Sequence, residues 1–148
     1  MTGTYWPHLF AIAVGAGLTV QVGMNAALGR AIDSPLWASI ANFTIGLIAL
    51  VACALALGTR PQVTTFGQVP TWAWLGGLLG AAYVFAVTLL GQRLGAVALV
   101  ALVLAGQLGA AVLLDHFGVL GFPRMEVTVQ RLLGAMLLVA GALLIVRR

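Results

Sequence analysis

Six polar side chains lie inside stretches that are otherwise apolar, and they are the residues best suited to bind a ligand. An unpaired polar group in hydrocarbon costs free energy, so each of them should face another helix or a cavity. Amides that face a cavity can hydrogen-bond a small solute. Amides that face a helix can instead form interhelical hydrogen bonds, worth about 0.6 kcal/mol each on average. Both interpretations stand for each residue. The six are Gln21, Asn25, Asn42, Tyr83, Thr88 and Gln107.

The depths of these side chains group them further. Gln21 and Asn25 are four residues apart and share one helix face. At 1.5 Å per residue, Gln21, Asn42 and Tyr83 each lie about 10 Å from the same side of the membrane, whereas Gln107 lies about 10 Å from the opposite side. In an antiparallel dimer, Gln107 of the partner subunit reaches the depth of the other three. The dimer then has two polar layers, each about 5 Å from the midplane of a 30 Å core.

The few acidic residues offer one candidate for proton handling. Asp33 is expected to cap a helix, and Glu126 to lie in a loop. Asp115 and His116 end an apolar run at the membrane interface. They either handle protons or serve as a helix-end cap or an ion pair with Arg124 or Arg131. No carboxylate lies in the middle of the membrane, where proton-coupled exporters usually carry one.

The composition places the chain in lipid. Hydrophobic residues make up 62% of the 148 residues, charged residues only 7%, and the mean hydropathy is +1.12. A soluble domain carries about 25% charged residues. The net charge is +4, but the arginines are scattered singly, so nucleic acid is excluded as a partner. The chain contains no catalytic triad, metal cluster, cofactor site or phosphate-binding loop, so we expect neither an enzyme nor a cofactor.

Five apolar runs are long enough to cross about 30 Å of hydrocarbon, or nearly so. Residues 1–148 are therefore predicted to form a single five-helix transmembrane domain, all-α, with its termini on opposite sides. The fifth run is short, and spans only if it begins near Val127 and Arg131 snorkels. The second is opened by Asp33, Ser34 and Pro35, a capping sequence. The runs are His8–Leu28, Leu36–Leu57, Trp72–Leu90, Leu94–Leu114 and Leu132–Val146.

The arginines give almost no orientation bias. Excess Lys and Arg mark the cytoplasmic side of a membrane protein. Three arginines fall on the side of the N-terminus and four on the other. Such a chain can insert both ways up, and two copies in opposite orientation can pair as an inverted repeat, an architecture of many transporters. The first group is Arg60, Arg124 and Arg131, and the second Arg30, Arg93, Arg147 and Arg148.

Several segments of the chain resemble one family of bacterial membrane proteins, the YdcZ family. The most specific is Gly106-Gln107 running into Leu114-Asp115-His116-Phe117-Gly118. The others are Gln21 to Asn25 with Leu28-Gly29, Gly76 to Gly80 with Tyr83, Leu94-Gly95, and Arg131 with Gly134. The resemblance implies a single five-helix repeat of the drug/metabolite transporter superfamily, working as two copies, in the bacterial inner membrane. Related four-helix multidrug exporters carry a glutamate in their first helix. Here Gln21 and Asn25 occupy that polar stretch, which fits a neutral or zwitterionic metabolite better than simple proton or cation antiport.

Together these features predict a multi-pass inner-membrane transporter of a small organic solute, working by alternating access. The expected partners are the lipid bilayer, the solute and a second copy in opposite orientation. Two alternatives remain open. The partner can be a sister chain of fixed opposite orientation, or the protein can be a membrane assembly subunit that transports nothing.

Overall fold

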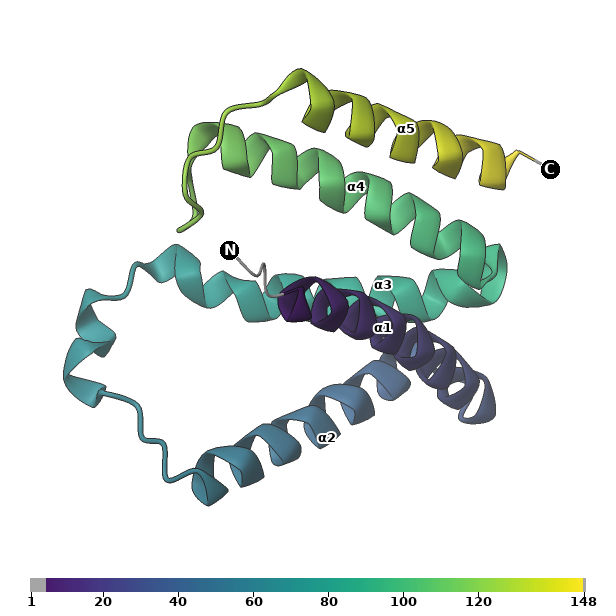
Figure 1. The fold of residues 1–148 in the computed structure, drawn as a ribbon. Coiled ribbons are helices and arrows are strands. Elements are labelled where there is room, and N and C mark those ends of the chain that lie inside the picture. Colours follow the sequence, from purple (N-terminus) through teal and green to yellow (C-terminus); the bar gives the residue numbers. More distant parts are fainter. Residues whose placement is uncertain (1–4, 148) are drawn as a thin grey trace. The chain divides into compact units, whose positions relative to one another are not determined.

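The computed structural model describes residues 5–147 and is all-helical over that range. Five helices or helix pairs are long and apolar enough to cross a membrane, which confirms the five predicted spans. Arg148, one of the seven arginines counted above, lies outside the described residues. The helices are α1 (Trp6–Ala31), α2 (Pro35–Ala56), α3 (Gly76–Leu94), α4 (Ala96–Phe117) and α5 (Val129–Val146), with 3₁₀ turns η1 (Val63–Gln68) and η2 (Thr71–Leu75) before α3 (Figure 1).

Large apolar side chains point outward along all five helices. Leu55 is 77% exposed, and Leu79 and Leu144 are each 71% exposed. Among residues 5–147, the fully buried apolar residues are few and mostly small: Ala26, Ala38, Val87, Leu99 and Ala142. A water-soluble domain hides such side chains in a core. Here lipid takes the place of that core, and polar groups are the ones that must find partners within the protein.

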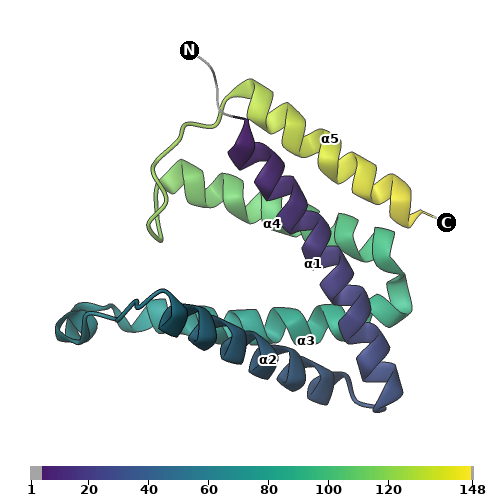
Figure 2. The same cartoon turned by 60° about the horizontal axis from the view of Figure 1, so that its bottom comes forward.

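The chain divides into two compact units, residues 1–93 and 94–148. In the first, α1 and α2 form a hairpin whose buried residues lie next to the connecting turn (Figure 2). Small residues allow this close approach. A Cβ atom on Gly29 would lie 3.3 Å from Pro35 Cα and 3.6 Å from Ala38 Cβ. Helices in lipid pack through such contacts because burial of apolar surface gives them no driving force.

The turn between α1 and α2 corrects one prediction. Ser34, and not Asp33, caps α2: its Oγ accepts a hydrogen bond from the Trp37 amide at 3.3 Å. Pro35 follows at the first helical position, where its missing N–H is not needed. Asp33 instead has a φ of +49°, a left-handed conformation that Asp tolerates better than most residues. The acid therefore shapes the turn and the serine caps the helix.

In the second unit, α4 and α5 run side by side as an antiparallel pair. The helix α4 continues three residues past Leu114, the predicted end, and stops at Gly118. This glycine has a φ of +62°, and its N–H donates to the Leu114 carbonyl at 2.9 Å. The fifth helix begins at Val129, three residues before the predicted Leu132 and two after Val127, where a full span was expected to require it to begin. The Thr128 hydroxyl is its cap.

Gly118 is required by both its conformation and its neighbours. A Cβ atom there would lie 2.8 Å from Arg124 Cβ, which is closer than real Cβ atoms approach. The left-handed conformation adds about 1–2 kcal/mol for any residue with a Cβ. The loop from α4 to α5 therefore folds back against a glycine that no other residue can replace without movement.

We predict that Gly118→Ala lowers the free energy of unfolding by about 2 kcal/mol or more, the sum of backbone strain and the clash with Arg124. Thermal unfolding in detergent measures this. Gly106→Ala is the matched control, because Gly106 is a mid-helix residue of α4 with no neighbour within 4 Å of an added Cβ. The control should be neutral or slightly stabilising. Equal effects of both substitutions would contradict the role assigned to Gly118.

Candidate functional site

Two of the predicted site residues meet directly in the first unit. Gln21 Nε2 of α1 donates a hydrogen bond to Asn42 Oδ1 of α2 at 3.0 Å, and both side chains are partly buried. From the ends of their helices, both residues lie about 4–5 Å from the helix centres at 1.5 Å per residue. The pair therefore lies near the middle of its two spans, in the region where water is absent and amides need partners.

The Gln21–Asn42 pair retains unused hydrogen-bonding capacity. A side-chain amide has two N–H donors and a carbonyl oxygen with two lone pairs. The observed bond uses one donor of Gln21 and one lone pair of Asn42. Gln21 Oε1 and the Asn42 amide nitrogen make no hydrogen bond to another residue of the range 5–147. The pair thus presents at least one acceptor and one donor side by side, a combination that suits a group which both accepts and donates.

One turn along α1, Asn25 is 7% exposed, and no hydrogen bond of its side chain joins it to another described residue. The neighbouring Ala26 carbonyl accepts a hydrogen bond from Gln92 Nε2 of α3 at 3.3 Å. Sequence analysis missed Gln92, because it stands beside Arg93 at the end of an apolar run. Its position four residues after Thr88 was the available signal, since that spacing places both on one face of α3.

Two polar residues of α3 stand apart from the amide pair. Thr88 is fully buried, and its hydroxyl has no hydrogen-bond partner among residues 5–147. Tyr83 is half-buried, and its hydroxyl makes no hydrogen bond within that range. With η2 included, the span runs from Thr71 to Leu94, so Tyr83 lies within about 1 Å of its middle. It is deeper than the sequence-based estimate, because the helix continues four residues past Leu90.

Gln107 belongs to the second unit and is exposed. It lies within about 1 Å of the middle of α4, because that helix extends to Phe117. The sequence-based estimate had placed it closer to one side, out of register with the other amides. Gln107 therefore lies, like Gln21, Asn42 and Tyr83, within about 5 Å of the middle of its own span. The difference in depth between Gln107 and the other three residues is therefore smaller than the sequence predicted. The sequence-based prediction of a partner subunit had relied on that difference.

Asp115 forms the ion pair with Arg131 that was one of its three expected roles. Arg131 Nη1 lies 3.5 Å from Asp115 Oδ2, with the two side chains 42% and 32% exposed. Arg131 Nη2 also contacts Met125 Sδ at 3.4 Å, and the Met125 amide donates to the Asp115 carbonyl at 2.8 Å. His116 is exposed and packs edge-on against Phe117, with ring centroids 5.0 Å apart. The Asp115–Arg131 ion pair therefore joins the start of α5 to the end of α4.

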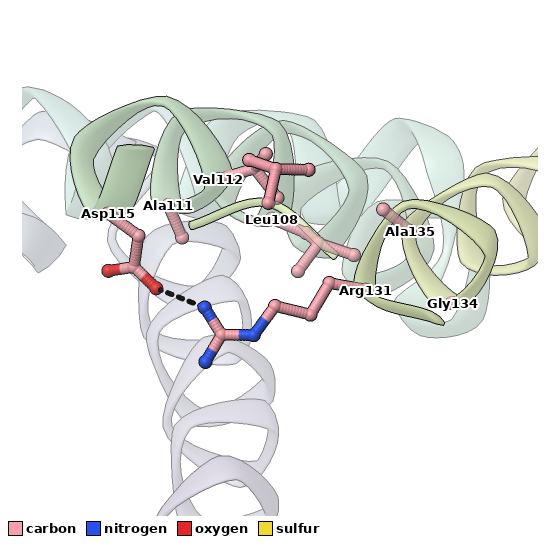
Figure 3. Close-up of a pocket in the computed structure, with 8 residues that line it drawn as sticks. Leu108, Ala111, Val112, Asp115, Arg131, Gly134 and Ala135 are labelled. Carbon is pink, nitrogen blue, oxygen red and sulfur yellow. Dashed lines mark hydrogen bonds and ion pairs between the residues drawn. The ribbon is translucent and has the colours of Figure 1, made fainter. Parts of the chain in front are cut away.

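A hollow of about 270 Å³ lies beside this ion pair, between α4 and α5 (Figure 3). Figure 3 shows Asp115 and Arg131 facing each other at one end of it, with small and aliphatic side chains along its wall. No three His, Cys, Asp or Glu residues of the described range come together as a metal site. The lining residues are Leu108, Ala111, Val112, Asp115, Val127, Arg131, Gly134 and Ala135.

Comparison with known proteins adds the family. A sequence profile described as "Putative inner membrane exporter, YdcZ" matches residues 6–144. The chain is also 32% identical over 143 residues to the inner membrane protein YdcZ of Escherichia coli strain K12, covering 94% of this chain and 93% of that protein. The chain belongs to the YdcZ family. It is a multi-pass inner-membrane protein with five helices long and apolar enough to span a membrane. No solved structure matches it.

The segment that most resembled the YdcZ family has a structural explanation here. Asp115 binds Arg131 and accepts the Met125 amide through its backbone carbonyl. Gly118 ends α4 in a left-handed conformation against Arg124. Both ends of the Asp115–Gly118 segment therefore hold the α4–α5 connection. These contacts favour the structural role of Asp115 and do not require one in proton coupling.

We predict that Asp115→Asn lowers the free energy of unfolding by less than about 1 kcal/mol, because the ion pair is partly exposed. The pH dependence of any flux should stay unchanged. A double-mutant cycle with Arg131→Gln isolates the pair energy, and flux against pH in liposomes tests the second point. If wild-type flux follows an imposed proton gradient and Asp115→Asn abolishes that dependence, then Asp115 is a coupling residue and its structural role is secondary.

Proposed function

We propose that this protein transports a small uncharged or zwitterionic organic solute across the inner membrane, and that the Gln21–Asn42 pair contacts that solute. The partly buried hydrogen bond between these amides near mid-span is the observation that carries the proposal. Membership of a family described as exporters supports transport as the activity. An amide pair carries no net charge, so it compensates little of the free energy that an ion loses when its hydration shell is removed.

The proposed working unit is an antiparallel homodimer that operates by alternating access, each chain supplying one repeat. The near balance of arginines on the two sides supports it. The mid-span positions of the polar residues are compatible with it as well. Turning a chain over leaves a residue at the bilayer centre at the same depth, so Gln107 and Tyr83 of either copy can reach one central layer. Asn25, one turn from Gln21, extends that layer toward one side.

Two alternatives make different demands. In the first, a sister chain of fixed opposite orientation replaces the second copy, and this chain then inserts in one orientation only. In the second, the protein is an assembly subunit without transport. In that case the amides serve only as interhelical hydrogen bonds, and no solute stabilises the protein. A screen of uncharged, zwitterionic and ionic solutes by thermal unfolding separates transport from assembly, because a ligand stabilises the fold it binds.

The orientation is the first prediction. A reporter fused to the C-terminus should show both cytoplasmic and periplasmic populations, because the imbalance is a single charge. Adding two arginines to the loop around Arg60 should fix the N-terminal side in the cytoplasm. As a control, two glutamines at the same positions should leave both populations present. A single orientation in the unmodified protein would exclude the antiparallel homodimer and favour the sister-chain arrangement.

The three mid-span amides, Gln21, Asn42 and Gln107, give the second prediction. Gln21→Leu, Asn42→Leu and Gln107→Leu should each reduce solute flux in liposomes at least tenfold, the effect of losing about 1.4 kcal/mol of binding. Expression and dimerisation should hardly change, because leucine suits lipid and each interhelical hydrogen bond contributes only about 0.6 kcal/mol. Thr19→Leu and Thr44→Leu are the matched controls. Thr44 is exposed and Thr19 is partly exposed. They lie two residues from Asn42 and Gln21 respectively, and each donates only to the carbonyl four residues earlier in its own helix.

The controls make the outcome decisive. If the amide variants disassemble while their folded fraction binds solute normally, the amides are structural and the proposed site is wrong. The same conclusion follows if the threonine variants lose as much flux as the amide variants.

A further inference from the structure

The hollow beside Asp115 and Arg131 continues along the helix pair. A second hollow of about 310 Å³ lies between the same two helices and shares two lining residues, Leu108 and Ala135, with the first. Together they form one groove, here called the α4–α5 groove. The residues that line the second part are all apolar or glycine: Leu108, Gly109, Ala135, Met136, Val139, Ala140 and Leu143.

The α4–α5 groove has the length of one membrane leaflet. From Arg131 to Leu143 the chain of α5 rises twelve residues, or about 18 Å at 1.5 Å per residue. One leaflet of a bilayer has a hydrocarbon thickness of about 15 Å, half of the 30 Å core. Arg131 stands in the first turn of α5, at the membrane interface, and the rest of the groove leads toward the middle of the bilayer. An acyl chain that starts at the interface follows the same path.

The groove carries charge only at its interfacial end. There an acid and a base lie side by side, with Arg131 Nη1 3.5 Å from Asp115 Oδ2. Both remain accessible, with 42% and 32% of their side-chain surfaces exposed. The Arg131 guanidinium has five N–H donors. One contacts Asp115 and one contacts Met125, which leaves three for another ligand. Asp115 Oδ1 accepts no hydrogen bond from another residue of the range 5–147. The end of the groove can therefore bind one anionic and one cationic group at once.

We propose that the α4–α5 groove binds a phospholipid whose headgroup carries a primary ammonium, of the phosphatidylethanolamine type. One acyl chain lies along the apolar wall, the phosphate binds Arg131, and the ammonium binds Asp115. The proposal concerns lipid binding and does not depend on the transported solute or on the amide pair.

Charge complementarity selects this headgroup. A guanidinium forms paired hydrogen bonds with phosphate oxygens, and a carboxylate accepts charge-assisted hydrogen bonds from a primary ammonium. Phosphatidylcholine carries the same charges, but its trimethylated nitrogen has no N–H to donate. Phosphatidylglycerol has the phosphate and lacks the cation, which leaves Asp115 facing an anion. Neither headgroup satisfies both ends of the ion pair.

The test uses the purified full-length protein in detergent and three lipids with identical dioleoyl chains: phosphatidylethanolamine, phosphatidylcholine and phosphatidylglycerol. Native mass spectrometry measures bound lipid against lipid concentration. Phosphatidylethanolamine should bind about tenfold more tightly than the other two, the effect of one charge-assisted hydrogen bond. Equal affinities of the three lipids for the wild type would overturn the proposal without any mutant.

Variants locate the lipid. Ala135→Leu, where the two hollows meet, should weaken phosphatidylethanolamine binding about tenfold by filling the groove. Ala110→Leu is the matched control, since Ala110 lies on α4 outside the groove lining, and it should bind as the wild type does. Asp115→Asn should abolish the preference for phosphatidylethanolamine over phosphatidylcholine.

Three results would overturn the assignment. The first is unchanged lipid binding in Ala135→Leu. The second is loss of dimer in Ala135→Leu with normal lipid binding by the remaining monomer, which would identify the groove as an interface between copies. The third is displacement of the lipid by glycerophosphoethanolamine, which has the headgroup without acyl chains, at the same concentration as by the lipid itself. That result would show that the apolar part of the groove contributes nothing.

Discussion

Hydrocarbon offers no hydrogen bonds, and this single constraint explains how polar residues are placed throughout the described chain. Several polar side chains within the spans bond their own helix or another helix, whereas Asn25, Tyr83 and Gln107 make no side-chain hydrogen bond to another residue of the range 5–147. Thr19 and Thr44 donate to carbonyls four residues back. Gln21 and Gln92 bond across to another helix, one to a side chain and the other to a backbone carbonyl. The buried Thr88 hydroxyl is an exception, because it lacks a hydrogen-bond partner within residues 5–147, and burying an unpaired hydroxyl costs free energy.

The same constraint explains which parts of the fold could be predicted from sequence. The five spans were evident, because a helix that crosses the membrane must be apolar over most of its length. Helix ends were harder, because backbone geometry decides them. Gly118 ends α4 through a left-handed conformation, after three residues of helix that include Asp115 and His116. Ser34 rather than Asp33 caps α2 because only its hydroxyl reaches the Trp37 amide. Hydropathy contains no information on either choice.

The candidate site was predictable in part for a related reason. Gln21 and Asn42 were predicted to lie at the same depth, but equal depth did not by itself predict the hydrogen bond between them, since Tyr83 was placed at that depth too and forms none with either residue. Gln92 was missed because depth alone marks it as interfacial, whereas its side chain reaches the Ala26 carbonyl on α1. Gln107 was placed too near one side because Leu114 was taken as the end of α4, which continues to Phe117. An error of three residues shifts a helical residue by about 5 Å, as large as the offset that was being interpreted.

Arg131 links these arguments, because it bears on orientation, folding and lipid contact together. It is one of the three arginines predicted to lie on the side of the N-terminus, and its pairing with an acid does not remove it from the positive charges that set orientation. It also joins α5 to α4 through Asp115 and stands where the groove meets the interface. In the proposed antiparallel homodimer, this ion pair lies in the inner leaflet in one copy and in the outer leaflet in the other. A net charge at that point would experience a different membrane surface potential in each of the two copies. An internally compensated pair, matched to a zwitterionic headgroup, meets nearly the same conditions in both, so the ion pair is compatible with either orientation of the chain.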